Sequence, residues 1–139
     1  MPELGERDRQ VVARLFAGAT RPVRVEVYVA GRPEAGPKTG FRAAIAEVAE
    51  LVPLLQVAEY GADQAGAAVE RTPAVWLRDG DGADLRVRFY GLPTGYEFSS
   101  LLAAAADAAT PQSALRAATL EALAGLEQDV QIKVFSTPT

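Results

Sequence analysis

The sequence of 139 residues contains no cysteine and no histidine. Without cysteine the chain cannot form disulfides, thiolate nucleophiles or thiolate metal ligands, and without histidine it lacks the usual general base near neutral pH. Asp79 and Asp81 supply too few oxygens for calcium and are typical of a turn. We therefore expect no metal site, no cofactor and no catalytic residue, and we do not expect the chain alone to be an enzyme.

The sequence also lacks an excess of positive charge and a long hydrophobic run. Its 14 basic and 18 acidic residues give a net charge of -4, which disfavours nucleic acid and anionic membranes as partners. The longest apolar run, Leu101 to Ala106, is too short to span a membrane, and the charged N-terminus has no secretory signal pattern. These features predict a cytoplasmic protein of one main domain.

The first half of the chain predicts a β-α-β unit. Residues 5–18 show helical spacing of apolar residues, and every second residue is valine in the strand expected over 23–29. A loop rich in Gly and Pro, 31–40, separates this strand from a helix over 41–52, and a second strand is expected over 54–60. A helical link between two strands favours a parallel crossover.

The next segments predict a hairpin followed by a helix. A third strand is expected over Pro73–Leu77 and a fourth over Leu85–Tyr90, with Asp79–Gly82 forming the turn between them. A helix is expected over Tyr96–Ala108. A β-α-β unit followed by a hairpin and a helix is the thioredoxin-like topology, an α/β fold with a central mixed four-stranded sheet and helices on both faces.

Two further elements are expected after this unit. Pro111–Ala124 is expected to form a helix capped by Thr110, with Gly125 near its end. Val130–Phe135 is expected to form a strand that leads into a Ser-Thr-Pro-Thr loop. A single thioredoxin unit requires neither element.

The segment Tyr90–Phe98, with the sequence YGLPTGYEF, is the most distinctive internal motif. Its structural interpretation is a joint between strand and helix, in which Gly91 and Gly95 allow unusual backbone angles and Thr94 and Glu97 form a capping box. The motif also resembles the corresponding segment in the N-terminal unit of glutaredoxin-like protein disulfide oxidoreductases. It is similar to the N-terminal domain of the flavoprotein subunit of alkyl hydroperoxide reductase as well.

This resemblance covers nearly the whole chain and implies a particular domain organisation. The family consists of two thioredoxin folds in tandem, with Cys-x-x-Cys in the second unit and, in many members, in the first. Residues 1–128 would then be a thioredoxin-like domain that lacks the redox pair. Residues 129–139 would be the first strand of a following unit, truncated just before a Cys-x-x-Cys motif that would begin after Thr139.

The resemblance also implies where a first-unit redox site would lie and what is missing from it. The degenerate loop comprises Arg32, Pro33, Glu34, Ala35, Gly36, Pro37, Lys38 and Thr39. Its charged residues are typical of solvated loops. The family places a cis proline at the position of Thr72–Pro73, where active members offer a backbone edge to an extended substrate. Here this groove either binds a peptide or is inherited architecture, and we favour the second interpretation.

Two functional hypotheses follow. The first, preferred, is a redox-inactive thioredoxin-fold domain that acts as a scaffold or docking module for a missing catalytic unit. The second is a free-standing binding or oligomerisation protein, whose partner is another protein, a peptide, or a second copy joined through the strand at 130–135. Arg86 and Arg88, with Tyr28 and Tyr90 nearby, could form a polar face on the sheet, although outward arginines are expected on a half-buried strand.

Overall fold

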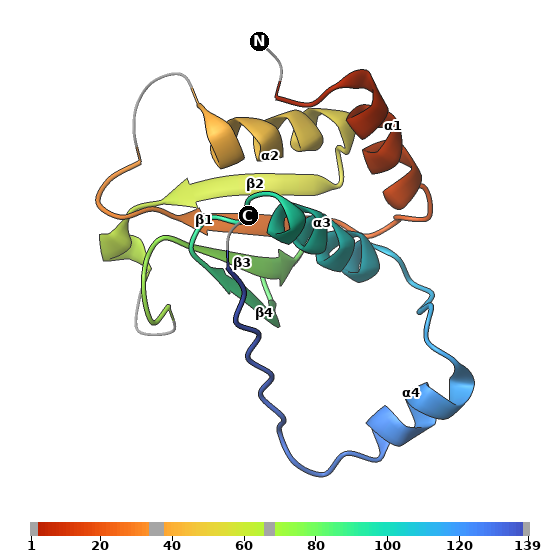
Figure 1. The fold of residues 1–139 in the computed structure, drawn as a ribbon. Helices are drawn as coiled ribbons and strands as arrows, with labels where there is room; N and C mark the ends of the chain where they lie inside the picture. The colour runs from red at the N-terminus through yellow and green to blue at the C-terminus, as the bar shows by residue number, and fades with distance from the viewer. Residues whose placement is uncertain (1–2, 34–37, 66–68, 138–139) are drawn as a thin grey trace.

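The computed structural model describes residues 3–33, 38–65 and 69–137. They form one four-stranded sheet in the order β2-β1-β3-β4 (Figure 1). The strands are β1 (Val23–Tyr28), β2 (Leu55–Tyr60), β3 (Ala74–Asp79) and β4 (Asp84–Tyr90). The helices are α1 (Glu6–Leu15), α2 (Gly40–Leu51), the 3-10 helix η1 (Ala62–Gln64), α3 (Tyr96–Ala109) and α4 (Ala117–Ala124).

Strand β1 lies inside the sheet and pairs on both sides. It is parallel to β2 and antiparallel to β3, and β3 is antiparallel to β4. The hairpin turn between β3 and β4 is closed by Asp79, whose Oδ1 accepts hydrogen bonds from the backbone N–H groups of Asp81 and Ala83 at 2.9 and 2.8 Å. The predicted β-α-β unit, hairpin and mixed four-stranded sheet are confirmed.

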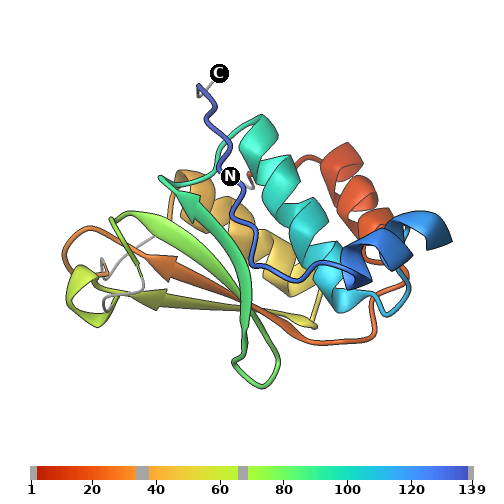
Figure 2. The ribbon, with the colours of Figure 1, turned by 90° about the horizontal axis from the view of Figure 1, so that it is seen from below.

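The main hydrophobic core lies between one face of the sheet and helices α1, α2 and α3, which share one side of the sheet in Figure 2. The valines of β1 that alternate toward this face, Val23, Val25 and Val27, are at most 1% exposed. Ile45 of α2 and Leu101 of α3 are fully buried against them. Burial of one such side chain stabilises the fold by about 1.5 to 3 kcal/mol, so this layer dominates the stability.

The opposite face of the sheet carries a smaller cluster. Tyr28, Ala74 and Trp76 are buried there with Val69, and Ala65, which follows η1, packs against them. Three α-helices cover one face of the sheet. Among the described residues, the other face is packed by Val69 and by Ala65, the residue that follows η1, while the residues of η1 itself are exposed.

The joint between β4 and α3 depends on two glycines in left-handed conformations, Gly91 with φ 88° and Gly95 with φ 56°. Gly95 is the N-cap of α3 and provides no side-chain hydrogen bond, so the predicted capping box of Thr94 and Glu97 is wrong. The backbone N–H of Glu97 instead donates to the carbonyl of Thr94 at 3.1 Å. The glycine takes the N-cap position because its backbone reaches an angle that threonine rarely adopts.

The C-terminal part differs most from the sequence-based expectation. The helix predicted over Pro111–Ala124 begins only at Ala117. Thr110, predicted to cap that helix, lies at the end of α3, where its Oγ1 donates to the carbonyl oxygen of Ala106 at 2.7 Å. The hydroxyl therefore closes the preceding helix and does not open the following one.

The strand predicted over Val130–Phe135 does not form in this structure. The segment belongs to no sheet, although the chain after α4 passes beside β4 in both views (Figures 1 and 2). Alternating apolar residues are sufficient to predict a strand, but a strand forms only when its backbone pairs with another edge. Within the described ranges, no helix is long and apolar enough to cross a membrane.

Candidate functional site

The end of the sheet where β1 stops and β3 starts brings together the residues singled out in the sequence. Tyr28, the last residue of β1, pairs with Ala74, the first residue of β3. The degenerate loop follows β1 and Thr72–Pro73 precedes β3, so the antiparallel pairing places both at the same end. Helix α2 also begins there, with Thr39 as its N-cap.

The Thr72–Pro73 peptide bond is cis, as the resemblance implied. The carbonyl oxygen of Pro73 accepts a hydrogen bond from the backbone N–H of Gly91 at 2.8 Å, which joins the start of β3 to the glycine after β4. Binding of a peptide to Thr72 and Pro73 stays a prediction.

The degenerate loop is described at its two ends only. Glu34, Ala35, Gly36 and Pro37 lie outside the described residues. Arg32 and Pro33 are exposed, as is Thr39. Lys38 is exposed as expected, but its Nζ also lies 3.1 Å from Oε1 of Glu59, at the end of β2, so this lysine has a specific partner.

Glu59 receives a second cation from the first turn of α2. Arg42 Nη2 lies 2.5 Å from Glu59 Oε2, and both side chains are only 12% exposed. The hydrogen bond from Arg42 lowers the pKa of Glu59, against the opposing effect of burial, and Lys38 lowers it further. An ionised carboxylate thus holds the end of the loop and the start of α2 against the sheet. Sequence reasoning missed this cluster because Glu59 is the one charged residue in an otherwise apolar alternation.

A pocket of about 280 Å³ opens beside this cluster. Its lining residues come from the end of β1, the loop, the start of α2 and the joint before α3: Val29, Ala30, Arg32, Thr39, Arg42 and Leu92. The lining offers one hydroxyl and two guanidinium groups as polar contacts. Because thiol-disulfide exchange requires a thiolate, these groups can bind a ligand but cannot perform that reaction.

A second polar cluster lies on the sheet face opposite the helices. Glu26 of β1 is only 5% exposed, and its Oε2 accepts hydrogen bonds from Tyr28 Oη at 2.6 Å and from Arg78 Nε at 2.9 Å. Burial, reinforced by the hydrogen bond to Glu26, raises the pKa of Tyr28 to about 12. The hydrogen bond to Glu26 raises the pKa of the Arg78 guanidinium. In this cluster the negative charge of Glu26 is therefore balanced by the positive charge of Arg78.

Sequence reasoning placed Tyr28 near this face but did not predict that Glu26 would be buried. Strand alternation assigns Glu26 to the outward side, where a carboxylate is expected in solvent. Glu26 is buried instead, and its carboxylate is held by Tyr28 and by Arg78 of the neighbouring strand β3. An arginine on the same side of that strand is the signal that could have indicated a paired carboxylate.

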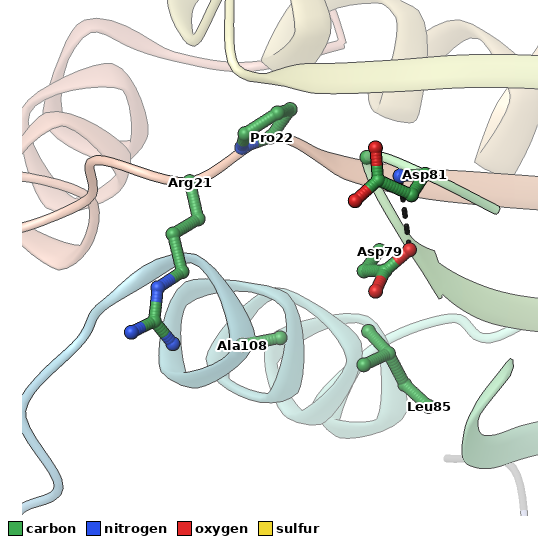
Figure 3. Close-up of a pocket in the computed structure, with 7 residues that line it drawn as sticks. Arg21, Pro22, Asp79, Asp81, Leu85 and Ala108 are labelled. Atoms are coloured by element: carbon green, nitrogen blue, oxygen red, sulfur yellow. Dashed lines mark hydrogen bonds between the residues drawn. The ribbon is translucent and has the colours of Figure 1, made fainter. Parts of the chain in front are cut away.

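Another pocket lies at the other end of the sheet, away from Thr72–Pro73. It has a volume of about 410 Å³, and Figure 3 shows Arg21 on one side and the carboxylates of Asp79 and Asp81 on the other. Leu85 and Ala108 form its apolar wall. Asp79 is engaged in closing the hairpin turn, and no group of metal-ligating side chains occurs among residues 3–33, 38–65 and 69–137. This pocket brings together none of the residues singled out for a site.

The sequence matches no protein-family model, and no curated protein is recognisably similar to it. Solved structures, in contrast, share its fold. The alkylhydroperoxide reductase protein AhpF from Enterococcus faecalis is 23% identical with a TM-score of 0.74 over 88% of this chain, and the NTD_N/C domain of the same protein is 23% identical with a TM-score of 0.71 over 85%. A protein disulfide oxidoreductase from Aeropyrum pernix is 24% identical with a TM-score of 0.59 over 91%.

The aligned region spans 61%, 58% and 56% of those three chains. At such low identity the likeness concerns the fold alone. The chain therefore has a thioredoxin-like α/β fold, similar to those of the alkylhydroperoxide reductase protein AhpF and a protein disulfide oxidoreductase, and it contains no cysteine.

Proposed function

We propose that the chain is a redox-inactive thioredoxin-fold domain that acts as a scaffold or docking module for a second, catalytic thioredoxin-fold unit. The domain keeps the cis proline and the sheet end at which thiol chemistry occurs in active members, but it has no sulfur nucleophile. Its role would then lie in holding a partner, while the thiols belong to that partner.

The observation that carries this proposal is the exposed apolar surface of residues 115–135, which we call the C-terminal arm. No residue of α4 is buried, and Ile132, Val134 and Phe135 are 83%, 85% and 90% exposed. An isolated helix shorter than about 12 residues is marginal in water, and α4 has eight. Apolar surface of this kind marks a protein contact, which supports a docking role for the arm.

The test compares the natural gene product with its arm variants. A reading frame that continues after Thr139 into Cys-x-x-Cys supports the proposal. In that longer protein we expect insulin reduction with dithiothreitol as electron donor. We expect Phe135→Ser to lower the rate because the catalytic unit loses part of the apolar surface that it contacts. A stop codon after Thr139, or full activity of the variant, would contradict the docking role.

A second candidate function, self-association, is favoured by the position of the arm. β4 is an edge strand, and the extended segment beyond α4 lies along it. Arg86 Nη2 is 3.4 Å from Asp129 Oδ2, and Ser136 Oγ donates to Glu97. An open edge beside an alternating apolar segment invites pairing between copies. Size-exclusion chromatography with light scattering tests this candidate, and a monomer at high concentration counts against it.

A further inference from the structure

The sheet face opposite the helices concentrates arginine side chains. Arg24 on β1 lies directly opposite Arg78 on β3, and Arg88 on β4 lies directly opposite Trp76. Strand pairing thus brings three guanidinium groups together on neighbouring strands. Like charges directly opposite each other on a sheet are destabilising unless a counter-charge compensates them.

Trp76 forms the centre of this surface without reaching solvent. The guanidinium carbons of Arg78 and Arg88 lie 4.3 and 4.1 Å from the centre of its rings, and Trp76 is only 4% exposed. The indole Nε1–H donates to Asp84 Oδ1 at 2.5 Å, which fixes the ring. Since arginine covers the tryptophan, the outer surface presented to a partner is guanidinium and not indole.

Only part of this positive charge is compensated within the chain. Arg78 pairs with Glu26, and Arg88 pairs with Asp84. Arg24 has no ion-pair partner among the described residues, and neither does Arg71, whose guanidinium lies 5.4 Å from the centre of the Tyr90 ring. This face is therefore positively charged on a chain whose net charge is -4.

We propose that this face docks an extended acidic polypeptide segment. Arg24 lies near the start of β1, and Arg71 lies just before β3, next to the end of β1. A segment that runs along the strands and reaches both cations needs about six residues at about 3.3 Å each. Its carboxylates would supply the counter-charge that Arg24 and Arg71 lack, and it would cross the guanidinium groups stacked on Trp76. This surface is separate from the C-terminal arm, so the proposal does not depend on the function proposed above.

The test measures binding of a dye-labelled oligoglutamate peptide of about six residues by fluorescence anisotropy, with Trp76 emission as a local reporter. Trp76 is the single tryptophan of the chain, so a change in its emission reports on this face. We expect saturable binding that weakens with added salt. We expect no binding of an oligolysine peptide of the same length.

Matched variants locate the contact. Arg24→Gln removes a cation that makes no ion pair in the described structure, and it should weaken binding about tenfold, as expected for one charged hydrogen bond. Arg7→Gln removes the same charge from the exposed surface of α1 and should leave binding unchanged. Equal binding by wild type and Arg24→Gln, an unchanged Trp76 emission, or equally strong binding of a single-stranded oligonucleotide would overturn the proposal.

Discussion

Arg42 in the first turn of α2 and Glu59 at the end of β2 form an ion pair of 2.5 Å in which each side chain is only 12% exposed. The pair lies at the sheet end that holds the cis proline, next to the loop where a redox site would be expected. Lys38 extends it into that loop. In this chain, ion pairs hold the end of the loop and the start of α2 against the sheet.

Replacing Glu59 with glutamine should destabilise the fold. Glu59→Gln keeps the size of the side chain but removes the carboxylate that Arg42 and Lys38 contact, so the mostly buried Arg42 and the exposed Lys38 lose this counter-charge. We expect the free energy of unfolding in urea to fall by about 1 to 3 kcal/mol at neutral pH. Glu50→Gln on the exposed side of α2 is the matched control and should change stability by less than about 0.5 kcal/mol.

The same carboxylate should make stability depend on pH in the acid range. The pKa of Glu59 is lowered in the folded state from an ordinary value of 4.5. Its contribution is therefore fully present above pH 4.5 and is lost as the pH falls through the lower folded pKa. We expect the difference in unfolding free energy between wild type and Glu59→Gln to shrink on acidification. A difference that stays constant down to the acid limit of folding would contradict this assignment.

Tyr28 should behave as a buried phenol with a hydrogen bond to a carboxylate. Its folded pKa is about 12, against an ordinary value of 10.0, so its stabilising contribution is complete below pH 10 and is lost as the pH rises toward 12. Phenolate absorbance should show a transition near pH 12 that Tyr28→Phe removes. If Tyr28→Phe leaves the titration curve unchanged, the Tyr28–Glu26 hydrogen bond is not maintained in solution.

Two isoleucines provide a matched test of the arm. Ile45 is fully buried in the main core and Ile132 is 83% exposed. Ile45→Ala should cost about 2 to 5 kcal/mol, whereas Ile132→Ala should leave unfolding of the isolated chain within about 0.5 kcal/mol of wild type. Binding of an apolar dye should decrease in Ile132→Ala. A large loss of stability in that variant would mean that the arm packs onto the domain in solution.

The sequence was sufficient to predict the sheet because its strands carry the signal in their own alternation. The valines of β1 and the Asp79–Gly82 turn fix topology through local chemistry, and the cis Thr72–Pro73 bond followed from the resemblance. Elsewhere the deciding contacts were not local. Thr110 has a hydroxyl suited to cap the start of a helix, but this hydroxyl donates a hydrogen bond to a carbonyl oxygen one turn earlier in α3.

The predictions for Val130–Phe135 and for Glu26 were both wrong because each depended on contacts with residues distant in sequence. The former has the alternation of a strand but pairs with no other strand, so its apolar side chains stay exposed. Glu26 has the alternation of a solvated residue but is buried, with Arg78 of the neighbouring strand as its ion-pair partner. In both cases a partner that is distant in sequence, absent or present, determines the outcome.

The most direct test of the redox-inactive assignment is insulin reduction by the isolated chain with dithiothreitol as electron donor. An active thioredoxin serves as the positive control. Because exchange requires a thiolate and the chain has none, the rate should equal the background rate of dithiothreitol alone. A clear acceleration by the chain would contradict the account.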